Sequence, residues 1–433
     1  MNAIVSVSLL LSALGLPLLL AFPALHTHLP RPIHMALLPA ATLVFIPVDF
    51  AIELPWFWLG AGLGIDALSR WWLAMSVVVW GVGAAFVPTP AKCDGYNPQT
   101  SLLLLFLVGQ IGAVLATDMI VFFSFTTLMS YACIGLLLTH GDETTRRAGR
   151  IYLVLLILAD ILLFEAVMMA TATTEYLDFA TLTKAMTLSE SSSFYLSMVI
   201  VGIALKVGVW PLHRWLSLSY YSVRPAMALL LWLGPVATGL LCGLRWLPLG
   251  ELAAPMAGAV LLAIGFATIF YAMLSVLRVQ WKQRLICVFF IATGSFVIGL
   301  GTGLIKPALW NQYGDSAHVF IASLGWGLAL MTAGLEWFKD EGETSGSSNE
   351  YLTELTVERW FDAFIRWGGR MGNETLPELR SSWFARCKGL WQKRGWQNAF
   401  DTGEYFLQRW SIATTLFILL VIVTLVLLLL DAM

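Results

Sequence analysis

One lysine lies inside an apolar stretch of this sequence. Lys206 follows an uncharged run from Phe194 to Leu205, and Pro211 and His213 come shortly after it. Insertion scales put the cost of an ammonium at the centre of a membrane span at about 2.5–3.5 kcal/mol. Proline removes a backbone donor, which is tolerated at membrane depth only beside protein or a water-filled cavity. A lysine beside a helix broken at Pro211 indicates an ion path, although an ammonium that reaches the membrane surface is the simpler alternative.

Two acidic residues, Asp160 and Glu165, lie in the apolar stretch that precedes this one. Acids at membrane depth usually face the interior of a helix bundle and find partners there. An ion pair between Lys206 and either acid would keep the lysine charged, and its loss would let burial favour the neutral amine. The same pair could be purely structural and lock two helices together, so both interpretations stay open.

The composition predicts an all-α polytopic membrane protein. Of the 433 residues, 58% are hydrophobic and only 12% are charged, whereas a soluble protein has about twice that charged fraction. The net charge of −2 says nothing about nucleic acid, and no nucleic-acid partner is expected. The five cysteines are scattered without the spacing of metal ligands, so we expect no iron–sulfur cluster, zinc site, disulfide framework or other cofactor. They are Cys93, Cys133, Cys242, Cys287 and Cys387.

Windows of about 20 apolar residues predict the spans. Only Thr117 and Asp118 separate the fourth from the fifth, which predicts a tight helical hairpin. The stretch from His213 to Pro225 is too polar for lipid and predicts a short half-helix and a loop. Twelve spans are expected near residues 3–22, 34–53, 68–88, 101–116, 119–138, 151–172, 194–210, 226–246, 253–276, 284–303, 316–337 and 410–430.

The positive charges predict the orientation of these spans. Twenty of the 25 lysine and arginine residues fall in the odd-numbered loops, and four fall in the even-numbered loops. Since cytoplasmic loops carry the excess of positive charge, the odd loops are expected in the cytoplasm and both termini outside it. We expect a multi-pass protein of a bacterial-type inner (plasma) membrane.

The segment 339–408 differs from the rest of the chain. A polar linker from Asp340 to Glu350 is followed by tryptophans and other apolar residues at helical spacing, with basic residues between them. Amphipathic helices of this kind lie in the membrane interface. A strap that docks partner subunits is the alternative, and the two are compatible.

Lys206 and the residues after it form a motif that resembles one from a known family of membrane proteins. Lys206 with Pro211-Leu-His-Arg-Trp-Leu216 is similar to the broken-helix signature of antiporter-like subunits. These subunits occur in respiratory complex I, multisubunit cation/proton antiporters and membrane-bound hydrogenases. Degenerate versions of further family motifs follow the family order over roughly residues 45–365. They are Gly64-Ile-Asp-Ala-Leu-Ser69, Phe123-Ser-Phe-Thr-Thr-Leu-Met129, Asp160, Arg245, Gln283-Arg-Leu285, His318 and Arg359-Trp-Phe361.

The resemblance implies two inverted five-helix repeats, a recognised design of transporters. Residues 1–100 would hold the first three helices and 101–250 the complete first repeat, helices 4–8. Residues 251–338 would hold a truncated second repeat, helices 9–11. The amphipathic segment 339–408 and a last span in 409–433 would complete the chain.

The chain departs from the family at its ionisable positions. Thr127 stands where the family has the fifth-helix glutamate, and Trp326 where it has the eleventh-helix lysine. Leu231 and Ala237 occupy the eighth-helix histidine or lysine positions. A complete ion path like that of the family therefore depends on substitutes.

Three functions are open at this point. The chain could translocate protons or sodium within a multisubunit energy-converting complex, coupled to a partner's redox reaction. It could be a non-conducting scaffold that kept the fold, or the membrane half of a proton-driven inorganic-carbon uptake system. The sequence indicates no catalytic site of its own, although the host could be an NADH/quinone oxidoreductase-like translocase or a membrane hydrogenase. Partners would be other membrane and cytoplasmic subunits and the lipid bilayer. The proton-path candidates are Lys206, His213, Asp160, Glu165 and His318.

Overall fold

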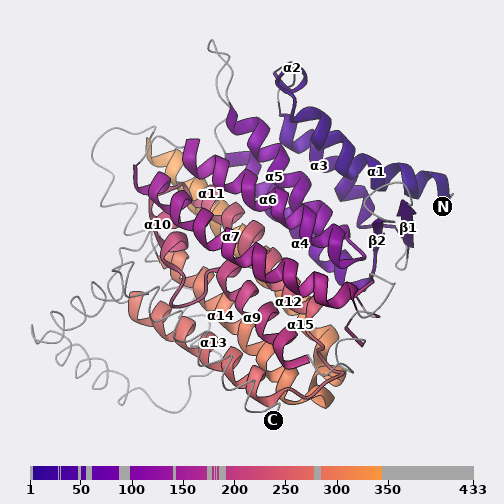
Figure 1. Cartoon of the computed structure of the whole chain (residues 1–433). Coiled ribbons are helices and arrows are strands. Elements are labelled where there is room, and N and C mark those ends of the chain that lie inside the picture. The colour runs from indigo at the N-terminus through magenta and orange to yellow at the C-terminus, as the bar shows by residue number, and fades with distance from the viewer. Residues whose placement is uncertain are drawn as a thin grey trace, which may run out of the picture. The chain divides into compact units, whose positions relative to one another are not determined.

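The computed structural model describes the chain from residue 3 to residue 343 (Figure 1). Gaps fall at 28, 30, 47–49, 55–60, 87–97, 140–142, 173–177, 180, 182, 185–191 and 277–283. The chain divides into two compact units, one of Met1–Ala333 with Ile418–Met433 and the other of Gly334–Phe417. All elements below belong to the first unit, apart from the end of the last helix. The predicted amphipathic segment beyond residue 343 and the predicted span 410–430 lie outside the described residues.

The N-terminal part contains short helices and a β-hairpin before its first long helix. The elements are α1 (Ala3–Leu20), α2 (Pro23–His26), α3 (Pro32–Leu43), β1 (Phe50–Leu54), β2 (Ala61–Ile65) and α4 (Ala67–Phe86). The predicted span 34–53 is therefore wrong in its second half, and the fold is not purely α-helical. Pro47 in the sequence explains why α3 cannot continue, because proline lacks the backbone donor and restricts the residue before it.

The hairpin is antiparallel. It is attached to residues 116–118, the turn between the fourth and fifth predicted spans. Phe50 pairs with Ile65 and Leu54 with Ala61. Both carboxylate oxygens of Asp118 accept backbone N–H groups at 2.8 Å, one from Gly62 of β2 and one from Val121. Burial raises the pKa of this carboxyl despite these hydrogen bonds. One side chain thus caps a helix and holds the hairpin.

The next three helices pack against one another in sequence order. They are α5 (Pro98–Leu115), α6 (Met119–Thr139) and α7 (Glu143–Thr171). The tight turn predicted between the fourth and fifth spans is present, with only residues 116–118 between α5 and α6. Helix α7 begins eight residues before the predicted span. Its first two turns carry charged, exposed side chains, so a window of apolar residues does not include them. There Glu143 forms a salt bridge with Arg146 at 3.1 Å.

A non-helical stretch at residues 208–213 separates α9 (Ser192–Val207) from α10 (Arg214–Ser222). The next span, Pro225–Trp246, is continuous but changes its winding. It consists of α11 (Pro225–Leu231), the π-helical segment η1 (Trp232–Ala237) and α12 (Thr238–Trp246). Pro235 lies inside η1, and because proline cannot donate the α-helical hydrogen bond, a local change of winding at this point is expected.

The last described helices are α13 (Pro255–Val276), α14 (Arg284–Ile305) and α15 (Pro307–Glu343). Helices α13 and α14 lie side by side (Figure 1). A Cβ on Gly258 would come within 2.7 Å of the Gly301 carbonyl oxygen, and one on Gly265 within 2.9 Å of Gly294. Glycines therefore let these two backbones approach closely.

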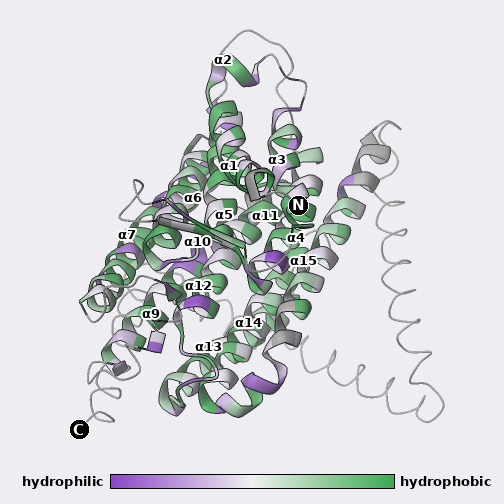
Figure 2. Cartoon of the chain, turned by 90° about the vertical axis from the view of Figure 1, so that its right-hand side faces the viewer, coloured by the Kyte–Doolittle hydropathy of each residue, from purple (hydrophilic) through white to green (hydrophobic). Residues whose placement is uncertain are grey.

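Seven helices of the described part are long and apolar enough to cross a membrane. Figure 2 shows the hydrophobic character of the helical ribbons. Helices α1, α3 and α9 are shorter apolar helices, and α15 is not among the seven. The predicted count of twelve spans stays a prediction. The seven are α4, α5, α6, α7, the continuous helix from α11 to α12, α13, and α14 from Leu285.

Candidate functional site: a buried lysine–aspartate pair

Lys206 lies in the last turn of α9, and its side chain is 2% exposed. Its Nζ lies 3.1 Å from Oδ1 of Asp160 on α7. The same ammonium donates to Oγ1 of Thr126 on α6 at 3.3 Å. Three helices thus contribute one group each to a buried ionic contact.

A glycine one turn before Lys206 allows this contact. A Cβ on Gly202 would lie 2.7 Å from Cγ of Leu163, so the absence of a side chain lets α9 approach α7 closely. Small residues at helix interfaces serve this purpose in membranes. Gly202 and Lys206 are four residues apart and therefore lie on the same face of the helix.

Two buried polar atoms on α7 and α6, Oδ2 of Asp160 and Oγ1 of Thr127, lack hydrogen-bond partners among the described residues. Thr127 stands where the resemblance implies a glutamate, yet Thr126 is the residue that contacts the ammonium. Thr126 was not predicted as part of the site, although Thr126 and Ser130 lie one helical turn apart on α6.

Further polar side chains continue from the pair toward the N-terminal end of α7. Tyr152 of α7 and Ser130 of α6 are buried, and neither hydroxyl has a hydrogen-bond partner among the described residues. The Tyr152 ring stacks on Trp215 of α10, with ring centroids 3.9 Å apart. Tyr220 of α10 is also buried, and its hydroxyl has no partner among the described residues. We call Thr126, Ser130, Tyr152 and Tyr220 the polar column.

The polar column runs along α6 and α7 because its members share helix faces. Thr126 and Ser130 are four residues apart on α6. Tyr152 and Asp160 are eight residues apart on α7, which is about 12 Å along the axis at 1.5 Å per residue. The column thus leads from Asp160 toward the arginine-bearing start of α7.

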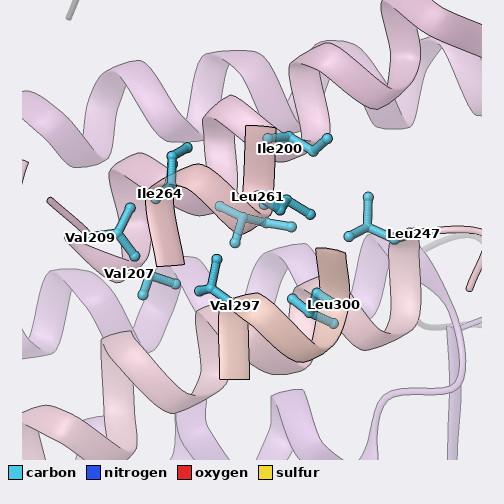
Figure 3. Close-up of a pocket in the computed structure, with 10 residues that line it drawn as sticks. Ile200, Val207, Val209, Leu247, Leu261, Ile264, Val297 and Leu300 are labelled. Carbon is cyan, nitrogen blue, oxygen red and sulfur yellow. The ribbon is translucent and has the colours of Figure 1, made fainter. Parts of the chain in front are cut away.

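The other side of α9 is apolar. A small pocket lies between α9, α13 and α14 and is lined only by aliphatic side chains (Figure 3). Ile203 and Val207 line it from α9, Leu261 from α13 and Leu300 from α14. Nothing in this lining can hydrogen-bond water, and apolar cavities of this kind stay dry. Polar surroundings of Lys206 therefore lie toward α6 and α7.

His213 and Pro211 lie in the stretch between α9 and α10. The His213 ring packs against Tyr271 and Phe290, with ring centroids 4.1 and 5.6 Å away. Its Nδ1 has no hydrogen-bond partner among the described residues. Pro211 was predicted as the helix break; α9 ends at Val207, and the non-helical stretch begins at Gly208 and includes Pro211. Gly208 has φ of 69°, in the left-handed region that glycine adopts readily.

The remaining sequence candidates lie apart from Lys206. Glu165 is exposed on α7. His318 belongs to α15, and its side chain lies outside the described part. Leu231 and Ala237, at family positions for ionisable residues, are buried within an apolar core. Trp326 packs against Trp71, with ring centroids 6.4 Å apart.

A second polar contact joins α12 to α4. Nη2 of Arg245 donates to Oδ1 of Asp66 at 3.1 Å and to Oγ of Ser69 at 2.8 Å. Phe179 lies 5.1 Å from the guanidinium. Burial would raise the pKa of Asp66, but the charge and hydrogen bonds of Arg245 and the hydrogen bonds of Ser69 lower it below its ordinary value. The sequence analysis named Asp66 and Arg245 in separate motifs and did not predict that they meet.

The described residues contain no group of three or more histidine, cysteine, aspartate or glutamate side chains that could hold a metal ion. An ammonium and a carboxylate in contact, like those of Lys206 and Asp160, are groups that can exchange a proton.

Sequence comparison identifies relatives for the middle of the chain. Residues 116–298 match the family described as NADH:quinone oxidoreductase/Mrp antiporter, transmembrane. NADH-quinone oxidoreductase subunit N of Paraburkholderia phymatum is 25% identical over 264 residues, 59% of this chain and 46% of that protein. One component of a probable K(+)/H(+) antiporter of Rhizobium meliloti is 30% identical over 175 residues, 39% of this chain and 32% of that protein. The matches thus span less than half the length of either relative.

Solved structures share the fold. A chain of the Mrp complex from Dietzia sp. DQ12-45-1b aligns with 77% of this chain and 37% of its own length, at a TM-score of 0.64 and 19% identity. A chain of respiratory complex I from Thermus thermophilus aligns with 75% of this chain and 71% of its own length, at a TM-score of 0.60 and 22% identity. The predicted resemblance to antiporter-like membrane subunits is confirmed: residues 116–298 match the model of the NADH:quinone oxidoreductase/Mrp antiporter family, and the fold is similar to that of chains in the Mrp complex and respiratory complex I.

Proposed function

We propose that this chain translocates protons within a multisubunit energy-converting complex of a bacterial-type plasma membrane, with Lys206 and Asp160 as its ionisable pair. The observation that supports this most directly is the buried ion pair at one end of a polar column. A charge at membrane depth is costly and usually functional. Among the described residues the ammonium has one acidic partner, and a pair of that kind can be separated by a small movement of one helix.

In this proposal Asp160 controls the proton on Lys206. While the carboxylate lies 3.1 Å away, its charge holds the ammonium. If α7 moves and Asp160 withdraws, burial favours the neutral amine, and the proton leaves through the polar column. Lysine suits this role because burial readily changes its protonation. Asp160 thus takes the part that the family gives to the glutamate at the position of Thr127.

The partner supplies the driving reaction. Chains of similar fold come from the Mrp complex, from a membrane-bound sulfane sulfur reductase described as an archaeal respiratory membrane complex, and from respiratory complex I. We assign residues 101–250 to the first inverted repeat and 251–338 to a shortened second one, and we propose a redox or uptake reaction in a partner subunit as the source of energy.

A non-conducting scaffold is the second candidate, and specific observations favour it. The family positions at Thr127, Leu231, Ala237 and Trp326 carry no ionisable group. The aliphatic pocket also places a dry layer between α9 and the helices of the second repeat. In that case the Lys206–Asp160 pair would only lock α9 to α7.

Substitution of Lys206 separates the two functions. Lys206→Ala should abolish coupled proton pumping, because it removes the amine that takes up and releases the proton. Lys206→Arg should also impair it, because arginine hardly ever deprotonates. Lys206→Ala alone leaves Asp160 buried and unpaired, which costs about 3–5 kcal/mol. The double variant Lys206→Ala with Asp160→Ala removes that cost and keeps assembly measurable.

Pumping and subunit assembly are measured together in membrane vesicles, with the exposed Lys306→Ala as the matched control. Loss of pumping in assembled Lys206→Arg and double-variant complexes supports translocation. Normal pumping in the assembled double variant removes the pair from the mechanism. If the chain is a scaffold, every variant complex that assembles should pump protons normally, and Lys206→Arg should be tolerated.

A further inference from the structure

Helix α7 presents an apolar stripe on the side away from the Lys206 site. Its members are between 44% and 60% exposed and follow helical spacing of three and four residues. Helix α7 packs against α6, α9 and α10, and among the members of the stripe the Phe164 ring also lies 5.9 Å from the Phe123 ring of α6. The α7 stripe comprises Val154, Ile157, Leu158, Ile161, Phe164 and Met168.

Glu165 interrupts the α7 stripe with a charge. Its side chain is exposed, and none of the described residues forms an ion pair or hydrogen bond with it. Arg150, fifteen residues earlier, lies about 22 Å away along the helix axis. If Arg150 marks the near edge of a hydrocarbon core about 30 Å thick, Glu165 lies about 8 Å inside the far edge.

Lipid alone is a poor neighbour for this residue, because an acid facing acyl chains is costly. The last apolar run of this chain, 410–430, contains no lysine, arginine or histidine. A second copy is also unsuitable. In a membrane a two-fold symmetric contact places equal depths of the two helices opposite each other, so Glu165 would face Glu165 across it.

We propose that the α7 stripe docks a transmembrane helix of another subunit, and that this helix presents a lysine, arginine or histidine to Glu165. The apolar members of the stripe would pack against the partner helix, and the carboxylate would set its depth and identity. Charged pairs across an interface fix register and select partners. This inference rests on the proposed function only in requiring a multisubunit complex.

The first test is photo-crosslinking in native membranes. A photoreactive amino acid replaces Ile161, the most exposed member of the stripe at 60%, and the adduct is identified by mass spectrometry. We expect an adduct with a transmembrane helix of a different subunit that carries a basic residue at the depth of Glu165. An adduct with lipid only, with a second copy, with another part of this chain, or with a helix lacking such a residue overturns the proposal.

The second test is charge reversal in the detergent-solubilised complex. Glu165→Lys should lower recovery of the crosslinked subunit about tenfold or more, because truncating or opposing one member of a buried charged pair is costly. The control is Glu251→Lys, which changes a carboxylate exposed in the turn before α13 and should leave recovery unchanged. Replacing the partner's basic residue by glutamate should restore recovery with Glu165→Lys. Unchanged recovery with Glu165→Lys, or no restoration, overturns the proposal.

The two proposals fail separately. If assembled Lys206 variants pump normally while the Ile161 adduct is as expected, the docking surface stands and translocation through Lys206 falls. If pumping depends on Lys206 but Ile161 labels only lipid, the docking surface falls and the proposed function stands.

Discussion

Two neighbouring threonines of α6 differ in the hydrogen bonding of their hydroxyl groups. Thr126 accepts a hydrogen bond from the ammonium, whereas the buried hydroxyl of Thr127 has no partner among the described residues. Hydrogen bonds to charged groups contribute about 1.5–3 kcal/mol. Thr126→Val should therefore lower the unfolding temperature of the detergent-solubilised protein, and Thr127→Val should leave it unchanged or higher. Equal losses from the two substitutions would show that the Lys206 contact is not the cause.

Residue types alone predicted the Lys206 pair but not its geometry. Lysine and aspartate are rare at membrane depth, so each drew attention by itself. The choice between Asp160 and Glu165 needed the structure, because both faces of α7 are apolar. Where lipid replaces water, periodicity does not mark which face of a helix is buried. The sequence signal for Thr126 was weak and consisted of its four-residue spacing to Ser130. Thr127 was considered instead, because it stands at the family's glutamate position.

The end of α9 depends on one glycine. Gly208 has φ of 69°, and a Cβ there would lie 2.7 Å from Nε1 of Trp215. Gly208→Ala should destabilise the protein by about 1–3 kcal/mol, the usual cost of a non-glycine residue in a sparsely populated backbone region.

The matched control for Gly208 is Gly81→Ala in the interior of α4, where a Cβ would meet no atom within 4 Å. Alanine exceeds glycine in helix propensity by about 0.8–1.0 kcal/mol, so this variant should be slightly stabilised. Thermal unfolding in detergent measures both, and a stabilised Gly208→Ala would contradict the strain.

The contact between the start of α4 and the end of α12 predicts acid sensitivity. The pKa of Asp66 is lower in the folded protein than its ordinary value of 3.8. The folded state therefore binds fewer protons than the unfolded state. This stability is present above pH 3.8 and is lost as the pH falls through the lowered pKa.

Unfolding temperatures measured at pH 7 and at steps below pH 4 test this. Wild type should lose more stability on acidification than Asp66→Asn, since asparagine cannot be protonated there. Parallel acid curves for the two proteins would mean that Asp66 makes no such contribution.

At the scale of elements the sequence predicted long apolar helices well and interruptions less well. The helices α4 to α7 and α11 to α14 match apolar windows because each needs about 20 such residues. The β-hairpin was missed because Phe50–Leu54 and Ala61–Ile65 are also apolar, and a short apolar run does not distinguish strand from helix. The end of α9 was placed at Pro211 because glycine gives no sign of its φ in a sequence.

The whole molecule should have one orientation in the membrane. The distribution of lysine and arginine predicts the segment from residue 339 to 408 in the cytoplasm and the loop after α7 outside it. Single cysteines at Glu175 and Ser347 should therefore react with impermeant reagents from opposite sides. Cys133, Cys242 and Cys287 are buried, so only Cys93 and Cys387 need replacement. Reaction of both positions from the same side would show that the span count is wrong.

The one-sided surroundings of Lys206 have an electrical consequence. The dry pocket lies on one side of α9 and the polar column on the other, so a proton exchanged with Lys206 would move along α7 rather than across the bundle. The path from Asp160 to Tyr152 covers about 12 Å of a hydrocarbon core of about 30 Å. Moving one elementary charge across the whole membrane changes its energy by about 2.3 kcal/mol for each 100 mV of membrane potential. That share of the field amounts to about 0.9 kcal/mol per 100 mV, so the voltage across the membrane would itself bias whether Lys206 holds its proton.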